Sequence, residues 1–183
     1  MKRLYVFILS IMLFSASFAQ DHLKFMGIPL DGTINQFQAK LVAKGVTLDV
    51  AANKHVRVGA RAFKGSFSGK NAQIFIYYDE SSKVVYRAKV VLESSDINIW
   101  ENTYNYFVNM LSTKYSDAEI KNYKNDGKEA IAFLLPNDGL SANTYLGIID
   151  VFRSTYLYTF TVHVDYTDTV NNVKHEKRNL EDL

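Results

Sequence analysis

The stretch KVVYRAKVVLESSDINIWENTYNYFVNMLSTKY, residues 83–115, contains two hydrophobic periods in succession. Over 83–92 apolar side chains alternate with others, which predicts a strand. Over 97–115 they recur every three or four residues, which predicts an amphipathic helix. Such a helix must bury its apolar stripe against a sheet. The strand face is Val84, Tyr86, Ala88, Val90 and Leu92, and the helix stripe is Ile97, Trp100, Tyr104, Phe107, Val108, Leu111 and Tyr115.

A second helix followed by strands is predicted on the amino-terminal side of this stretch. Thr33 and Gln36 have the spacing of a capping box, so a helix begins at Ile34, and Gly45 ends it. Four strands follow, at 46–50, 55–67, 72–78 and 83–92. The predicted helix at 97–115 is likewise followed by strands at 119–123, 129–135, 145–152 and 156–165, with a turn at Arg153-Ser154-Thr155 before the last.

The two halves align with a shift of about 70 residues, which indicates an internal duplication. Phe37 then matches Phe107, and Ile74 and Ile76 match Leu146 and Ile148. Coincidence remains the alternative, because any two amphipathic segments can be aligned. The predicted fold is α+β: a tandem α-β-β-β-β repeat forming one antiparallel sheet of about eight strands, with two helices packed on one face.

Residues 1–19 have the pattern of a secretory signal peptide. Lys2 and Arg3 precede an apolar run over 4–14, and small residues lead to a cleavage site after Ala19. An uncleaved membrane anchor is the alternative, but the apolar run is too short to cross a bilayer core of about 30 Å. The predicted location is therefore periplasmic or secreted, with no membrane span after cleavage.

The domains expected after the leader are a first repeat at 20–95, a second repeat at 96–166, and a polar, mobile tail at 167–183. Without Lys2 and Arg3 the chain has 19 basic and 19 acidic residues. A neutral chain lacks the charge pattern expected for binding nucleic acid. The absence of Cys excludes disulfides and Cys-based sites.

Tandem helix-plus-four-strand units after a signal peptide resemble the β-lactamase inhibitor protein fold and the small periplasmic proteins that share it. The segments that carry the resemblance are 25–33, FMGIPLDGT, and 63–69, FKGSFSG; it covers about residues 25–166. It implies this fold and a non-catalytic role. The inhibitor itself is disulfide-bonded, which this chain cannot be.

We find no residue pattern for catalysis, a cofactor or a metal. The four His residues have no metal-ligand spacing. Gly65-Ser66-Phe67-Ser68-Gly69-Lys70 fits neither a nucleophile elbow nor a phosphate-binding loop, and is interpreted as a bend. The short pattern Asp168-Thr169-Val170 resembles an O-glycosylation site of some Gram-negative bacteria.

Aromatic residues make up 14% of the chain and are the most informative feature for function. If Ile74 and Ile76 pack under the helices, the residues between them face the uncovered side, together with Val85. Tyr, Phe and Arg are enriched at the centres of protein interfaces. The predicted partner-binding residues are Phe75, Tyr77, Arg87, Lys89, Thr159, Thr161 and His163.

These residues predict an exported, non-catalytic protein-binding module, of the inhibitor or immunity type, with a protein partner of unknown identity. One alternative is a small-ligand carrier or sensor with an aromatic pocket between sheet and helices. A cavity beneath Trp100 would favour that alternative. A hydrolase is a third hypothesis, which a carboxylate or His pair in a cleft would favour.

Overall fold

The structure is a computed structural model that describes residues 21–125, 128–137, 145–156 and 159–181. The expected leader at 1–19 lies outside the described residues. The sequence also predicts turns at Asn125-Asp126-Gly127 and at 136–139, and residues 126–127 and 138–139 of these turns lie outside the described residues as well.

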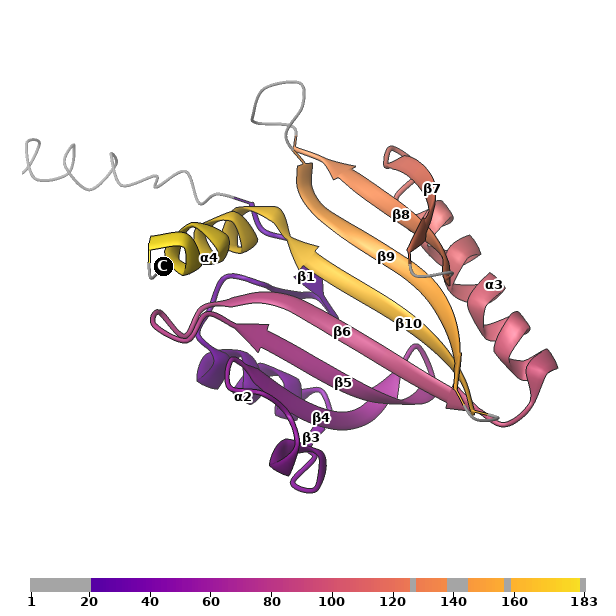
Figure 1. Cartoon of the computed structure of the whole chain (residues 1–183), viewed down its shortest axis with the longest axis horizontal. Helices are drawn as coiled ribbons and strands as arrows, with labels where there is room; N and C mark the ends of the chain where they lie inside the picture. The colour runs from indigo at the N-terminus through magenta and orange to yellow at the C-terminus, as the bar shows by residue number, and fades with distance from the viewer. Residues whose placement is uncertain (1–20, 126–127, 138–144, 157–158, 182–183) are drawn as a thin grey trace, which may run out of the picture.

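A single eight-stranded antiparallel sheet forms the frame of the molecule (Figure 1). Its strand order is β3-β4-β5-β6-β10-β9-β8-β7, so the last strand in sequence lies at the centre, beside β6. With its helices the fold is α+β, as predicted. The strands are β3 (Thr47–Leu48), β4 (Ala60–Phe67), β5 (Lys70–Tyr78), β6 (Val85–Ser94), β7 (Glu119–Asn125), β8 (Lys128–Pro136), β9 (Tyr145–Tyr156) and β10 (Thr159–Asp168).

Both predicted helices are present, and their caps are visible. Helix α2 (Ile34–Ala43) begins with the capping box of Thr33 and Gln36. Helix α3 (Ile97–Lys114) is capped by Asp96, whose carboxylate accepts hydrogen bonds from two backbone N–H groups of the first turn. A one-turn helix, η1 (Ala52–Lys54), and a two-stranded sheet, β1 (Lys24–Phe25) with β2 (Ile28–Pro29), complete this part of the chain.

The core lies where α2, α3 and the amino-terminal segment meet one face of the sheet. Phe37 of α2 and Phe107 of α3 are buried in the same cluster as Ile74 and Ile76 of β5. Rings from distant parts of the chain also meet here, since Phe67 stacks on Phe107 with 5.5 Å between centroids. We call this side of the sheet the core face.

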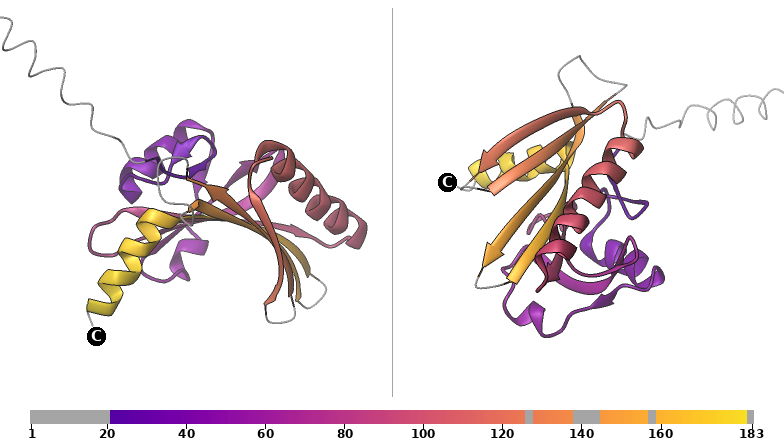
Figure 2. Two further views of the ribbon diagram at one scale, coloured as in Figure 1. Left: turned by 90° about the horizontal axis from the view of Figure 1, so that it is seen from above. Right: turned by 90° about the vertical axis from the view of Figure 1, so that its right-hand side faces the viewer.

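A third helix, α4 (Thr169–Glu181), occupies the region where the sequence predicted a polar, mobile tail. Figure 2 (left) shows α2 and α3 on one side of the sheet and α4 on the other, at one end. Helix α4 contacts β6, β9 and β10. Only Asn171 of α4 is buried, and its amide donates to the backbone carbonyl of Leu30 at 2.7 Å. The apolar residues Val173 and Leu180 of α4 are exposed, so no buried apolar stripe attaches this helix to the sheet.

The predicted side-chain phase is wrong at the start of β6 and in β9, whereas Ala88, Val90 and Leu92 of β6 face the core as predicted. In β6 a bulge opposite Tyr77 and Tyr78 shifts the register, so Val85 is fully buried in the core instead of Val84 or Tyr86. In β9 the fully buried residues are Ile149 and Val151, while the predicted Leu146 is partly buried and packs against the core. In these parts of β6 and β9, residues that point to either face are apolar, so the sequence shows no clear alternation. The turn expected at 153–155 is also wrong, because β9 continues through these residues.

Candidate functional site

The strand register places the predicted partner-binding residues on the face of the sheet opposite the core face, which we call the second face. Phe75 lies opposite Lys89, and Tyr77 lies opposite Arg87, across β5 and β6. Residues opposite each other on neighbouring strands share a face. The same register adds Thr161 and His163 of β10, whose partners on β6 are Glu93 and Val91.

Two residues that the sequence placed on this face lie elsewhere or at its margin. Thr159 is exposed at the first position of β10, at the margin of the second face. Val85, which the sequence analysis also placed there, is buried in the core. The remaining predicted residues are half-buried, because they cover one another.

Arg87 forms an ion pair with two hydrogen bonds on the second face. Its Nε donates to Asp165 Oδ1 at 2.7 Å and its Nη2 donates to Asp165 Oδ2 at 2.5 Å. The hydrogen bonds that Arg87 donates to Asp165 raise the pKa of Arg87 above its usual range. The guanidinium also lies 5.0 Å from the centre of the Tyr77 ring. Asp165 is only 2% exposed, so this paired charge fixes the orientation of Arg87 and Tyr77.

A second group of contacts orders the neighbouring strands β9 and β10. The rings of Phe152 and His163 stack with 4.4 Å between centroids and 5° between planes. Lys89 places its ammonium 5.2 Å from the centre of the Phe152 ring. The hydroxyl of Thr161 lies 2.8 Å from His163 Nε2. Cationic and aromatic side chains are therefore held together on this face, not extended individually into solvent.

Sequence reasoning missed the acidic residues of the second face. Asp165 lies directly opposite Asp150 on β9. Tyr123 of β7 donates its hydroxyl hydrogen to Asp150 Oδ1 at 2.9 Å. Burial, together with the negative charge of Asp165, raises the pKa of Asp150 despite the hydrogen bond from Tyr123 and the charge of Arg87.

The only sequence signal for this acidic pair was Asp165, on the polar phase of its predicted strand. Asp150 could not be placed on the second face, because the expected phase of β9 was wrong by one residue. Strands β7, β8 and β9 are consecutive neighbours in the sheet, so the missing information was the side-chain phase of β9 and not the strand order.

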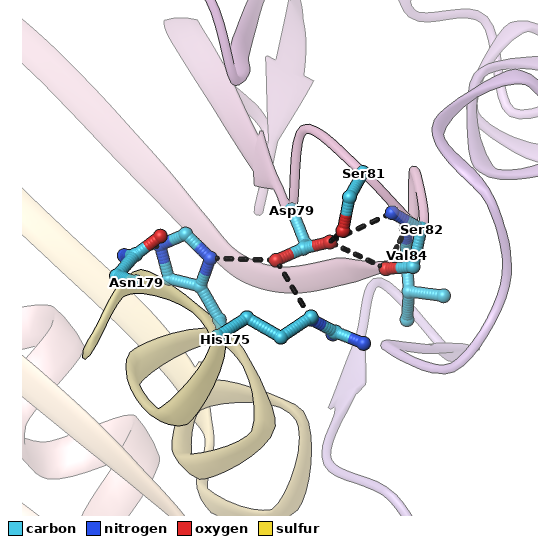
Figure 3. A network of polar contacts seen from close by, with 7 residues as sticks. Asp79, Ser81, Ser82, Val84, His175 and Asn179 are labelled. Atoms are coloured by element: carbon cyan, nitrogen blue, oxygen red, sulfur yellow. Dashed lines mark hydrogen bonds and ion pairs between the residues drawn. The ribbon is translucent and has the colours of Figure 1, made fainter. Parts of the chain in front are cut away.

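Asp79 organises a second polar cluster, between the β5–β6 turn and α4 (Figure 3). Its Oδ1 accepts hydrogen bonds from the hydroxyls of Ser81 and Ser82 and from the Ser82 backbone, each at 2.8 Å. Its Oδ2 lies 3.0 Å from His175 Nδ1 and accepts a bond from Arg178 Nε at 3.2 Å. Burial alone would raise the pKa of Asp79, but the hydrogen bonds from His175 and the serines outweigh it, and the pKa lies well below its usual range.

A cavity of about 530 Å³ lies beside this cluster, where α4 meets the second face. Tyr77 and Arg87 form one wall, and His175 and Arg178 of α4 form another. The ring of His175 stacks on Tyr86 with 4.3 Å between centroids. One end of the predicted binding face is thus part of a pocket instead of an open sheet surface.

A smaller cavity, of about 280 Å³, lies between α3 and the ends of β5 and β6. Trp100 lines it together with Ile99 and Leu92, and Lys70 and Glu93 supply polar groups. The indole N–H of Trp100 donates to the backbone carbonyl of Thr161 at 3.0 Å, which fixes the ring.

The predicted modification residue Thr169 is the first residue of α4. Its hydroxyl is buried and makes no hydrogen bond with the described residues. The preceding Asp168 is fully buried and accepts hydrogen bonds from the backbone N–H groups of Asn171 and Leu23. A glycosyltransferase could not reach this hydroxyl in the folded chain.

Comparisons of the chain with protein-family models, with curated proteins and with solved structures give no match. Within the described ranges, no group of three or more His, Cys, Asp or Glu side chains could hold a metal ion. None of the helices in that part of the chain has the length and apolar character needed to cross a membrane.

Proposed function

We propose that this chain is an exported, non-catalytic module that binds a protein partner through the second face of its sheet. The observation that carries the proposal is the set of half-buried aromatic and cationic side chains held there by Asp165 and by stacking. Tyr and Arg are the residue types most enriched among those that dominate binding energy. Because neighbouring side chains already fix them, little ordering entropy is lost on docking.

We propose the periplasm or the outside of the cell as the location. The support is the sequence pattern of residues 1–19: a positive start, a short apolar run and small residues before the cleavage site. Mass spectrometry of the amino terminus of the protein from an envelope fraction would test this, and a chain that begins at Gln20 is expected. A chain that still begins at Met1 would contradict it.

We further propose that the chain is a tandem α-β4 repeat of the β-lactamase-inhibitor-protein-like fold. The strand order supports this, since β3 to β6 and β7 to β10 occupy one half of the sheet each and meet at the β6–β10 pair. A helix also precedes each set of four strands. An inhibitor or immunity protein, which blocks a secreted enzyme or toxin by covering it, is the role that suits such a module.

The test is partner capture from the native envelope fraction with variants of the second face. Phe75→Ala and Tyr77→Ala remove ring area and leave the bond between Arg87 and Asp165 in place. Tyr106→Ala is the matched control, since Tyr106 is a 44% exposed tyrosine of α3. We expect the two face variants to lose the partner that the wild type and Tyr106→Ala retain. Equal capture by all four proteins would refute the proposal.

The small-ligand carrier is a second candidate function, and the cavity beside Trp100 favours it. Its volume of about 280 Å³ is at the lower limit for ligand sites, which span about 300–1,000 Å³. The chain contains one Trp, so its fluorescence reports directly on this cavity. A saturable change on titration with laurate, abolished by Thr103→Phe at the cavity wall, would support the carrier; an unchanged signal would exclude an apolar ligand there.

A further inference from the structure

The cavity of about 530 Å³ between α4 and the second face has an unusual lining of three arginines from three different segments. Arg57 comes from the loop before β4, Arg87 from β6 and Arg178 from α4. Guanidinium groups match carboxylate and phosphate oxygens with paired N–H donors. Their convergence on one cavity indicates recognition of an anion.

Donors remain available on each of these arginines. Arg87 uses its Nε and Nη2 on Asp165, and Arg178 uses its Nε on Asp79. The side chain of Arg57 is exposed and forms no hydrogen bond or ion pair with the described residues. Since a guanidinium carries five N–H donors, each of the three can still bind a ligand oxygen.

The acidic groups around the cavity do not cancel this positive character. Asp79 is only 3% exposed, and both of its oxygens are already bound to the serines of its turn and to α4. Asp165 is bound to Arg87 and is not among the residues that line the cavity. Glu80 is the one exposed carboxylate among the described residues that line the cavity. Of the remaining titratable groups there, His175 is bound to Asp79 and stacked on Tyr86.

We propose that this cavity binds a small organic anion that bears carboxylate or phosphate groups. Arg57 and Arg178 contact the anionic groups, and the rings of Tyr77 and Tyr86 form the wall against its carbon skeleton. The volume lies within the range of about 300–1,000 Å³ found for ligand sites. The cavity shares Tyr77 and Arg87 with the predicted partner-binding residues, but Arg57 and Glu80 are outside that set and can be changed separately.

Isothermal titration calorimetry of the purified chain with citrate and with inorganic phosphate tests the proposal. The ionic strength is kept at about 10 mM, where charge interactions reach about 30 Å. Trimethyl citrate, which has the same skeleton without the charges, is the control ligand. We expect saturable binding of citrate or phosphate and none of trimethyl citrate; the anion that binds identifies which oxyanion the site prefers.

Two variants of the rim give opposite expected effects. Arg57→Gln should weaken binding by roughly tenfold, because it removes one charge-assisted contact. Glu80→Gln should strengthen binding by a few-fold, about the effect of one exposed charge. Both residues are exposed, so neither change threatens the fold. Arg153→Gln is the matched control, since Arg153 lies over Trp100 and Tyr104, outside the cavity lining.

Absence of saturable binding of both anions to the wild type would overturn the proposal. Equal weakening by Arg57→Gln and Arg153→Gln would overturn it too, because the effect would then reflect only the net charge of the protein. Partner capture by Arg57→Gln should equal that of the wild type, so the two proposals fail independently.

Discussion

The two faces of the same eight strands are stabilised by different forces. On the core face, Ile74, Ile76 and Phe107 are fully buried and contact other apolar groups. On the second face, Tyr77 and Arg87 are half-buried and depend on Asp165 for their orientation. A period-two pattern identifies which residues share a face. It does not show that a polar face is internally ordered by ion pairs and ring stacking.

The largest effect is expected from the core face. Phe107→Ala should lower the free energy of unfolding by about 3–5 kcal/mol, because the large ring leaves a cavity next to Phe67. Urea denaturation followed by circular dichroism measures this. Phe75→Ala on the second face is the comparison, and a smaller loss is expected because Phe75 is only half-buried. Equal losses of unfolding free energy would show that the second face contributes as much to stability as the core face.

Arg87→Ala should cost about 2 kcal/mol, which is less than Phe107→Ala. It leaves the buried carboxylate of Asp165 without its partner, although water can reach a site where Arg87 is 38% exposed. The double variant Arg87→Ala with Asp165→Asn should recover part of this loss, as measured by the same urea denaturation. A double variant that is less stable than Arg87→Ala would contradict this explanation. It would show that the unpaired charge of Asp165 is not what destabilises Arg87→Ala.

Asp79→Asn should cost about 1–2 kcal/mol by weakening the contacts of His175 and Arg178 with the β5–β6 turn. The pKa of Asp79 is lowered in the folded state, so its contribution is present above the ordinary Asp value of 3.8 and is lost as the pH falls below it. The difference from the wild type should therefore shrink in acid. Denaturation at a series of pH values measures this.

Glu80→Gln is the matched control for Asp79, since Glu80 is an exposed acid in the same turn. It should change stability by less than about 0.5 kcal/mol at every pH. A pH-independent loss in Asp79→Asn would show that the cluster acts through packing instead of charge.

A smaller effect than that of Asp79→Asn, with the opposite sign, is expected from Asp150→Asn. The pKa of Asp150 is raised by burial and by Asp165, so its ionised form opposes folding, and stability falls as the pH rises through the folded pKa. At neutral pH the variant should be as stable as the wild type or more stable by up to about 1 kcal/mol, the scale of a cross-strand charge pair. A clear loss of stability would show that the ionised Asp150 is needed, and would favour a functional role for the pair.

Local signals predicted much of the fold. The capping box at Thr33 and the stripe of α3 are properties of neighbouring residues, and both helices begin where the sequence indicates. The strands were found with boundaries displaced by a few residues. The β6 bulge was missed, because one extra residue reverses the phase of Val85 and leaves the composition of the strand unchanged.

Long-range contacts account for what the sequence could not predict. The pairing of Arg87 with Asp165 joins residues that are far apart in the chain, and the alternation of β10 indicated only that Asp165 would be polar. Helix α4 was missed for a different reason. Its attachment relies on Asn171, His175 and Arg178 instead of an apolar stripe. The sequence did contain one signal, because Asp168 is a typical N-cap residue and accepts a hydrogen bond from the backbone N–H of Asn171.

The central position of β10 has a consequence for how the molecule is made. Until residues 159–168 have been synthesised, β6 and β9 present unpaired edges, and the first four strands have no neighbour from the second half. The two halves of the sheet can therefore join only after β10 has been synthesised. A chain cut before residue 159 would have two separate sheets, each with an exposed edge strand that can pair with other molecules. Insertion of β10 between β6 and β9 therefore protects the protein against aggregation.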